Sequence, residues 1–200
     1  MSDCLVIGGG VIGMMTARSL ALAGAKVTLL DQQQCAQESS WAGGGIISPL
    51  YPWKYDDLTN ELSIASQVVY EQLCAQIFED TGLDPEYLKS GLLMMDEFNT
   101  SEAKTWMQKY RLDYQPHARG VLFADIAQVR NPRLLKALKA DITNKGVTII
   151  EQTRVEGLLS SNGYATGLKP INKIIYLIIL WSAQALGVQS GSRLRRGCFQ

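Results

Sequence analysis

Apolar and small residues at the start of the chain predict a strand, a helix and a second strand. Residues 4–7 form a short apolar run without polar alternation, as expected of a strand covered on both faces. Residues 11–23 form an apolar helix that should stop at Gly24, a residue suited to a helix end. Residues 26–30 repeat the buried-strand pattern. Together they predict one βαβ unit.

Helical spacing returns further along the chain. Residues 57–81 carry apolar side chains at helical spacing, which predicts a packing helix that ends at Gly82. These residues are Leu62, Ala65, Val69, Leu73 and Ile77. A second helix should begin at Asn131 and Pro132, because Asn caps helices and Pro suits the first turn. It should carry an apolar face and end at Gly146, and the residues of that face are Leu134, Leu135, Leu138 and Ile142. We also expect strands at 91–95, 121–124 and 147–150 and a short helix at 103–110.

A glycine motif separates the first strand from its helix. Gly8, Gly10 and Gly13 satisfy the GxGxxG spacing: the first glycine permits the sharp turn, the second admits a pyrophosphate and the third lets helix and strand approach. Val11 and Ile12 lie in this turn, at a helix N-terminus that favours anions. A purely structural glycine turn is the alternative.

An acidic residue stands where the motif requires one. Asp31 ends the second strand, 21 residues after Gly10, and its carboxylate can accept hydrogen bonds from ribose hydroxyls. Because the strand, the turn, the helix and this acid agree, we interpret residues 4–31 as a dinucleotide-binding unit rather than a structural turn.

A second glycine-rich segment follows at residues 39–49, with three consecutive glycines at 43–45. Glycines are tolerated where the backbone passes close to another group. We therefore predict that the backbone of this segment packs against a flat ring. A flexible loop is the alternative.

Composition describes an ordinary globular chain of 200 residues, 46% hydrophobic and 19% charged. The formal net charge of zero hides an asymmetry: residues 1–167 carry 14 basic and 19 acidic side chains, whereas 168–200 carry five basic and no acidic one. This tail is too sparsely basic to predict a nucleic-acid partner. The apolar run at 174–181 is too short for a bilayer span, which needs roughly 20 residues.

Cysteine and histidine usage limits the chemistry. The four cysteines form no CxxC pair, which suits reduced thiols and predicts a cytoplasmic protein. The single histidine, His117, excludes multi-histidine metal sites and is expected in a solvated loop. We therefore expect no metal, and no export signal because no basic residue precedes the first apolar run.

Several of these stretches are shared with one family. The glycine turn, the strand end at Asp31, the Ser-Ser-Trp-Ala-Gly-Gly-Gly segment from Ser39, and the Asn131-Pro132-Arg133 helix start resemble the amino-terminal half of the D-amino-acid oxidase family of flavoproteins, particularly its glycine oxidase branch, which serves thiamine biosynthesis. The resemblance covers residues 1 to about 167.

The resemblance implies FAD as cofactor. It places Val11 and Ile12 at the pyrophosphate turn with the three motif glycines, and Asp31 and Gln32 at the adenosine ribose. It further places Ser39 and Ser40 on the pyrophosphate side, Gly44, Gly45 and Ile46 against the flavin ring, and Val155 at the adenine through its backbone. Many relatives have Glu where Asp31 stands.

The implied activity is oxidation of glycine, sarcosine or a related small amino acid or amine by hydride transfer to flavin, with oxygen as acceptor and hydrogen peroxide as product. The arginine that pairs with the substrate carboxylate in relatives belongs to their second half, so no catalytic residue is assigned here. We expect weak or no turnover. The alternative is a non-catalytic FAD-binding or nucleotide-binding fragment. For the oligomeric state, a homo-oligomer is one expectation.

The expected architecture is α/β: a Rossmann-type FAD-binding βαβ domain with a parallel sheet, plus part of an α+β substrate domain inserted after the second strand. We assign residues 1–50 and 126–167 to an incomplete FAD-binding domain, 51–125 to the substrate domain, and 168–200 to a tail outside the family. A frameshift could have produced this tail, and a membrane-associating segment at 174–196 is a further alternative.

Overall fold

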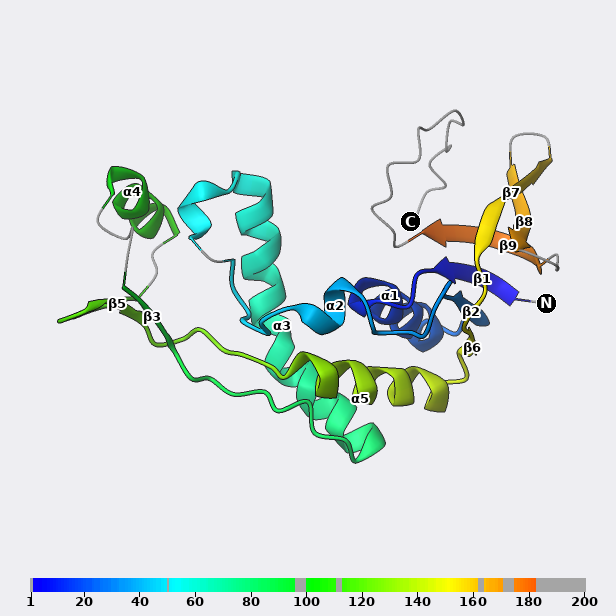
Figure 1. The fold of residues 1–200 in the computed structure, drawn as a ribbon, viewed down its shortest axis with the longest axis horizontal. Coiled ribbons are helices and arrows are strands. Elements are labelled where there is room, and N and C mark those ends of the chain that lie inside the picture. The colour runs from blue at the N-terminus through cyan, green and yellow to red at the C-terminus, as the bar shows by residue number, and fades with distance from the viewer. Residues whose placement is uncertain are drawn as a thin grey trace. The chain divides into compact units, whose positions relative to one another are not determined.

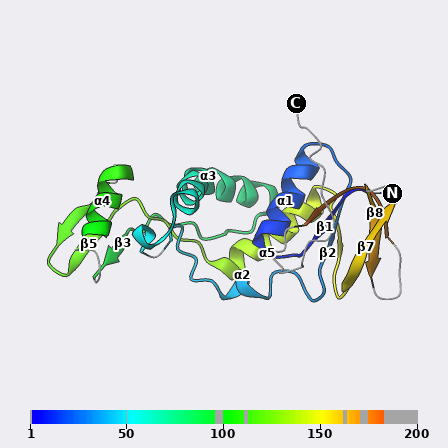
Figure 2. The ribbon, with the colours of Figure 1, turned by 90° about the horizontal axis from the view of Figure 1, so that it is seen from above.

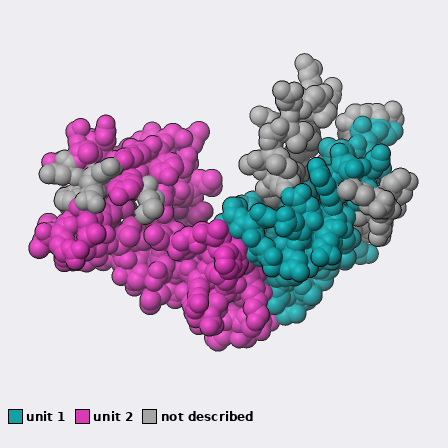
Figure 3. All heavy atoms as spheres, viewed as in Figure 1, with its two compact units in different colours: residues 1–40, 138–200 teal, residues 41–137 magenta. Residues whose placement is uncertain are grey.

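The computed structural model describes residues 2–49, 51–95, 100–110, 113–161, 164–170 and 175–182. The chain divides into two compact units, drawn in different colours in Figure 3. The first unit contains Met1–Ser40 and Leu138–Gln200, and the second contains Trp41–Ala137.

The first unit is built on a six-stranded sheet of order β6-β2-β1-β9-β8-β7 (Figure 1). Strand β1 pairs in parallel with β2 on one side and β9 on the other, and β2 pairs in parallel with β6. Strand β8 is antiparallel to both β7 and β9. The strands are β1 Ser2–Ile7, β2 Val27–Leu30, β6 Thr148–Ile150, β7 Val155–Ser161, β8 Tyr164–Pro170 and β9 Ile175–Ser182.

The predicted βαβ unit is confirmed. Helix α1, Val11–Leu22, follows β1 and leads into β2, whose four residues are all buried. The helix ends where expected: Ala23 caps it, and Gly24 has φ +88°, a left-handed conformation that suits glycine. Figure 2 shows α1 beside β1 and β2 from a second direction. The parallel α/β class that the sequence predicts is therefore correct.

The core of this unit forms between the sheet and its helices. Leu5, Leu30 and Leu168 have no exposed surface, and Ile150 and Val155 pack against them. Helix α5, Asn131–Asn144, buries Leu138 and Ile142 completely on the face that the spacing predicts. Burying one such side chain contributes roughly 2 kcal/mol. The helix is followed by Gly146 at φ +81°, as the sequence predicts.

The second unit holds a long helix, a short one and a small sheet. Its strands form the antiparallel order β3-β5-β4. Met94, Val121 and Phe123 from this sheet form a buried cluster with Ala103 and Met107 of α4. The elements are α2 Ser39–Ala42, which begins at the unit boundary, the 3₁₀ turn η1 Pro52–Lys54, α3 Asp57–Thr81, β3 Leu92–Met94, α4 Ser101–Tyr110, β4 Gln115–His117 and β5 Gly120–Phe123.

Helix α3 has the predicted bounds but not the predicted packing face. Asp56 caps it by accepting a hydrogen bond from Thr59 N over 2.8 Å, and Gly82 ends it at φ +69°. Leu62 is 72% exposed and Val69 is 54% exposed, so the expected apolar face is wrong at these positions. Ile77, another member of the predicted face, is buried as expected, and the helix also buries Asn60 and Cys74, which that face did not include.

The two units divide the chain differently from the sequence-based assignment. The first boundary falls after Ser40 rather than at residue 50, so the Gly43–Gly45 stretch lies in the second unit, and the second boundary lies inside α5 rather than at residue 125. Gly167 is not an end of the first unit, since it lies within β8, and β9 inserts between β1 and β8. Residues beyond Gly167 belong to the first unit because β9 pairs with β1, a strand that is distant in the sequence, and the sequence did not reveal this pairing.

The apolar run predicted at 174–181 lies almost entirely in β9, Ile175–Ser182, so backbone pairing accounts for it as a sheet strand. No helix in the part of the chain that the structure describes is long and apolar enough to cross a membrane. Residues 183–200, including Arg193, Arg195 and Arg196 of the suggested tail, lie outside the described residues.

Candidate nucleotide-binding site

A cavity of about 340 Å³ lies at the ends of β1 and β2 in the first unit. Eight residues that the sequence singled out line it: Gly8, Gly10, Ile12, Gly13, Asp31, Gln32, Ser39 and Ser40. Four others line it as well and were not predicted: Gln34, Ala36, Gln37 and Glu38. The carboxyl ends of parallel strands are where open α/β sheets bind ligands.

The glycine turn has the geometry its spacing predicts. Gly8 leaves β1 at φ +103°, and its N–H donates to Leu30 O over 2.8 Å. Gly10 caps α1 without a side-chain hydrogen bond, and a Cβ at Gly10 would lie 3.0 Å from Ser40 Oγ. A side chain here would therefore fill the space between the turn and Ser40.

The amino terminus of α1 provides a setting for an anion. Its first turn contains no acidic residue, so the helix itself carries no negative side chain at the positive end of its dipole. Val11 N donates to Ser40 Oγ over 3.0 Å, which brings this hydroxyl to the helix end. Backbone N–H groups and hydroxyls at a helix N-terminus are the donors that a phosphate requires.

Asp31 is oriented by the backbone around it. Its Oδ2 accepts a hydrogen bond from Gly9 N over 2.6 Å, and its Oδ1 accepts one from Gln33 N over 2.7 Å. An ionised carboxylate has about four acceptor positions, so two remain for ribose hydroxyls. The acid therefore shapes the glycine turn and also lines the cavity.

Val155 does not line this cavity. It begins β7, pairs with Pro170 of β8 and packs its side chain against the Leu5, Leu30 and Leu168 cluster. Its expected role through the backbone stays a prediction.

The Gly43–Gly45 stretch is held inside the second unit. Gly45 has φ +74°, and its carbonyl accepts from Val129 N over 2.9 Å. Ile46 forms a bridge with Gln128 and is 37% exposed. Gly44 lines a cavity of about 620 Å³ together with Glu86, Arg130 and Asn131, among others. Close approach of two backbones thus explains the glycine at 45.

The sequence missed a polar network beside the first cavity. Cys35 N donates to Glu151 Oε1 over 2.6 Å, and Lys139 Nζ lies 2.7 Å from the same oxygen. Burial, followed by the charge of Glu151, raises the pKa of the Cys35 thiol to about 12, so the thiol is neutral. The hydrogen bond from Lys139 lowers the pKa of Glu151. The one feature of the sequence that could have indicated this network is that Glu151 directly follows the strand predicted at 147–150.

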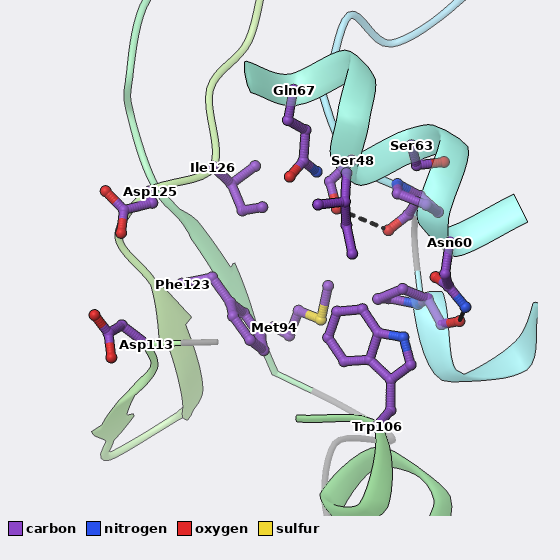
Figure 4. Close-up of a pocket in the computed structure, with 13 residues that line it drawn as sticks. Ser48, Asn60, Ser63, Gln67, Met94, Trp106, Asp113, Phe123, Asp125 and Ile126 are labelled. Atoms are coloured by element: carbon purple, nitrogen blue, oxygen red, sulfur yellow. Dashed lines mark hydrogen bonds between the residues drawn. The ribbon is translucent and has the colours of Figure 1, made fainter. Parts of the chain in front are cut away.

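A smaller cavity of about 80 Å³ lies in the second unit, between α3, α4 and the sheet (Figure 4). Met94 and Trp106 point into it, and Phe123 lies beside them. The Trp106 Nε1 and Asn60 Oδ1 atoms are buried without a hydrogen-bond partner, although Asn60 Nδ2 donates to Pro52 O over 3.0 Å. Because Met94 and Phe123 are core residues, this cavity belongs to the core of the unit.

The described residues contain no group of three His, Cys, Asp or Glu side chains that could hold a metal ion. His117 is exposed, and its Nδ1 accepts from Arg119 N over 3.1 Å.

The first cavity fits the adenosine diphosphate part of FAD. A glycine turn without Cβ atoms, a helix amino terminus, two hydroxyls and a strand-end carboxylate supply the donors and acceptors that a pyrophosphate and a ribose need. The sheet and this site define an α/β dinucleotide-binding protein.

The particular family follows from comparison with known proteins. The chain belongs to the DAO family of FAD dependent oxidoreductases, whose model matches residues 3–180. The match extends past Gly167, the point where the sequence-based resemblance ended, and reaches into β9. FAD is the cofactor that this family implies.

Individual relatives agree with the family. The chain is 37% identical to the glycine oxidase of Pseudomonas aeruginosa, over 91% of this chain and 56% of that protein. It is also 37% identical to the glycine oxidase of Pseudomonas putida, over 86% of this chain and 52% of that protein. Among solved structures, the glycine oxidase of Bacillus cereus superposes with a TM-score of 0.81 at 28% identity, covering 92% of this chain and 55% of that one. The chain spans about half the length of these relatives.

Proposed function

We propose that the cavity at the ends of β1 and β2 binds the adenosine diphosphate part of FAD. The observation that carries this proposal is that eight of the residues chosen from the sequence line one cavity at a helix amino terminus. Gly8, Gly10 and Gly13 would admit the pyrophosphate, and Ile12 would line the turn. The remaining predicted members, Val11, Gly44, Gly45, Ile46 and Val155, stay assigned by resemblance.

The polar residues that line the cavity would contact different parts of the dinucleotide. Ser39 and Ser40 would donate to the pyrophosphate, the second from a position already beside Val11 N. Asp31 would accept from the ribose with Gln32 beside it, because its two oxygens keep acceptor capacity beyond the bonds to Gly9 and Gln33.

We further propose oxidation of glycine, sarcosine or a related small amino acid or amine as the reaction in which this chain takes part. The glycine oxidases that it resembles at 37% identity support this substrate class. FAD held in this cavity would supply the acceptor for a hydride from the amine-bearing carbon and would pass the electrons to oxygen, giving hydrogen peroxide. The residues of the first unit contribute by holding and orienting the dinucleotide.

Titration with FAD, followed by quenching of flavin fluorescence, tests the binding proposal. We expect the purified chain to bind FAD, and Gly10→Ala to weaken binding at least tenfold because its Cβ would meet Ser40 Oγ at 3.0 Å. Gly157→Ala is the matched control, since a Cβ at Gly157 has no atom within 4 Å. Absence of FAD binding by the parent chain would refute the proposal.

Peroxide release separates the two candidate functions. With FAD present, glycine and sarcosine should give weak peroxide release if the chain has the proposed activity. Bound FAD without peroxide from either substrate would favour the alternative, a FAD-binding module without catalysis.

A further inference from the structure

Cys35 occupies the space that Gly9 leaves open. Both residues are buried, and Cys35 is only 5% exposed. A Cβ built on Gly9 would overlap Cys35 Sγ, and it would lie 2.9 Å from Cys35 Cβ and 3.1 Å from Asp31 Oδ2. Ala36 N also donates to Gly9 O over 2.9 Å. The segment after Asp31 is thus packed directly on the middle of the glycine turn.

A distant ion pair holds Cys35 in this position. Glu151 Oε1 accepts from Cys35 N over 2.6 Å and also from Lys139 Nζ over 2.7 Å. Lys139 lies on α5, and Glu151 follows β6, so neither belongs to the glycine turn or to the residues that line the cavity. Hydrogen bonds to an ionised acceptor are about twice as strong as neutral ones.

The backbone beside Glu151 strengthens the same connection. Gln152 N donates to Gln33 O over 2.9 Å, and Thr153 N donates to Asp31 O over 2.8 Å. Gln152 adopts φ +52°, a conformation uncommon for a residue with a side chain. The turn after β6 is therefore joined to the Asp31 segment by backbone as well as side-chain bonds.

We propose that Lys139 and Glu151 are positioning residues for FAD: they hold Cys35 against Gly9 and so fix the glycine turn and Asp31 in the arrangement that receives the pyrophosphate and ribose. This inference rests on the proposed FAD site. Lys139 and Glu151 act at a distance from the dinucleotide, through the Cys35 backbone. A turn that is fixed before binding loses less conformational freedom on binding, so affinity should depend on this pair.

The test is the dissociation constant for FAD and for ADP, which shares the pyrophosphate and ribose. Lys139→Met and Glu151→Gln should each weaken both ligands at least tenfold, whereas Lys139→Arg should remain within threefold of the parent because it keeps the charge. Lys136→Met is the control, since Lys136 is exposed on the same helix and does not line the cavity.

Thermal unfolding of each variant separates positioning from loss of fold. The proposal requires that affinity falls in Lys139→Met while the unfolding midpoint stays within a few degrees of that of Lys136→Met. Affinity within twofold of the parent in a folded Lys139→Met protein would overturn the inference. A parent chain that binds neither FAD nor ADP would instead overturn the proposed function.

A second pair of variants tests the packing step even if Lys139→Met does not fold. Gly9→Ala should abolish detectable ADP binding because its methyl overlaps Cys35. Cys35→Gly removes the overlapping atoms, so the double variant Gly9→Ala with Cys35→Gly should regain at least tenfold of the lost affinity. Equal affinities for the single and double variants would show that Cys35 does not act through Gly9.

Discussion

Arg18 of α1 donates from Nε to Asp141 Oδ2 of α5 over 2.7 Å, and the Asp141 side chain has no exposed surface. Lys145 completes the arrangement, since its Nζ lies 2.6 Å from Asp141 Oδ1. This buried cluster ties α1, whose amino terminus lines the candidate FAD site, to the carboxyl-terminal half of α5. The helix at the candidate FAD site is thus anchored by charge as well as by apolar packing.

Removing Arg18 should strongly destabilise the first unit. In Arg18→Met a buried carboxylate keeps only Lys145, and breaking a buried ion pair costs about 3 kcal/mol. Urea denaturation should show a fall of this size in the free energy of unfolding. The double variant Arg18→Met with Asp141→Leu should recover part of it, because it removes the fully buried carboxylate together with its guanidinium partner. A single variant as stable as the parent would contradict this account.

Adjacent glycines in the second unit should differ in their tolerance of alanine. Gly45 has φ +74° and a Cβ there would overlap Val129 O, so Gly45→Ala should destabilise the protein by more than about 1 kcal/mol. A Cβ at Gly44 has no atom within 4 Å, so Gly44→Ala is the matched control and should leave the unfolding midpoint unchanged. Thermal unfolding measures both, and equal shifts would refute the distinction.

Acid should weaken the Lys139–Glu151 interaction. Its hydrogen bond with Lys139 holds the pKa of Glu151 below the ordinary 4.5. The stabilisation from this lowered pKa is therefore fully present above about pH 4.5 and is lost as the pH falls through the folded-state pKa. Lys139→Met should reduce the slope of unfolding free energy against pH below about 4.5, whereas Lys136→Met should retain it. Identical acid slopes for the parent and Lys139→Met would argue against the assignment.

Exposed apolar residues on α3 should promote self-association. Leu58, Leu62 and Val69 are 78%, 72% and 54% exposed and follow helical spacing along one side. Leu58→Gln with Leu62→Gln should shift the sedimentation profile toward monomer at high protein concentration, with little change in thermal stability. Gln72→Ala, at an exposed polar position of the same helix, is the control. Unchanged sedimentation of the double variant would show that this side of α3 does not mediate association.

Local features were predictable because neighbouring residues determine them. Asp56 and Gly82 set the ends of α3, so its bounds of residues 57 and 81 could be predicted before the fold was known. The glycine turn, α1 and Asp31 form a contiguous stretch whose spacing indicates a dinucleotide site, and the structure brings most of the chosen residues to one cavity.

Other features depend on pairing between distant segments. Which side of α3 is buried depends on what lies against it, and Leu62 and Val69 are exposed although their spacing predicts a packing face. The short strand β4 exists because it pairs with β5, and β9 lies between β1 and β8 because it pairs with both. A run of apolar residues does not indicate which strand will be its neighbour. The sequence-based resemblance ended at Gly167, and this boundary is wrong, because the family match continues to residue 180.

The sequence by itself determined the βαβ unit, the glycine turn, the helix ends and the acid at position 31, because backbone conformation and side-chain periodicity act over a few residues. Only the tertiary structure showed that Cys35, separated from Glu151 by 116 positions, fills the space beside Gly9 and is held there by Lys139. Such a contact depends on how β6 pairs with β2 and where α5 lies, and these are properties of the folded chain as a whole.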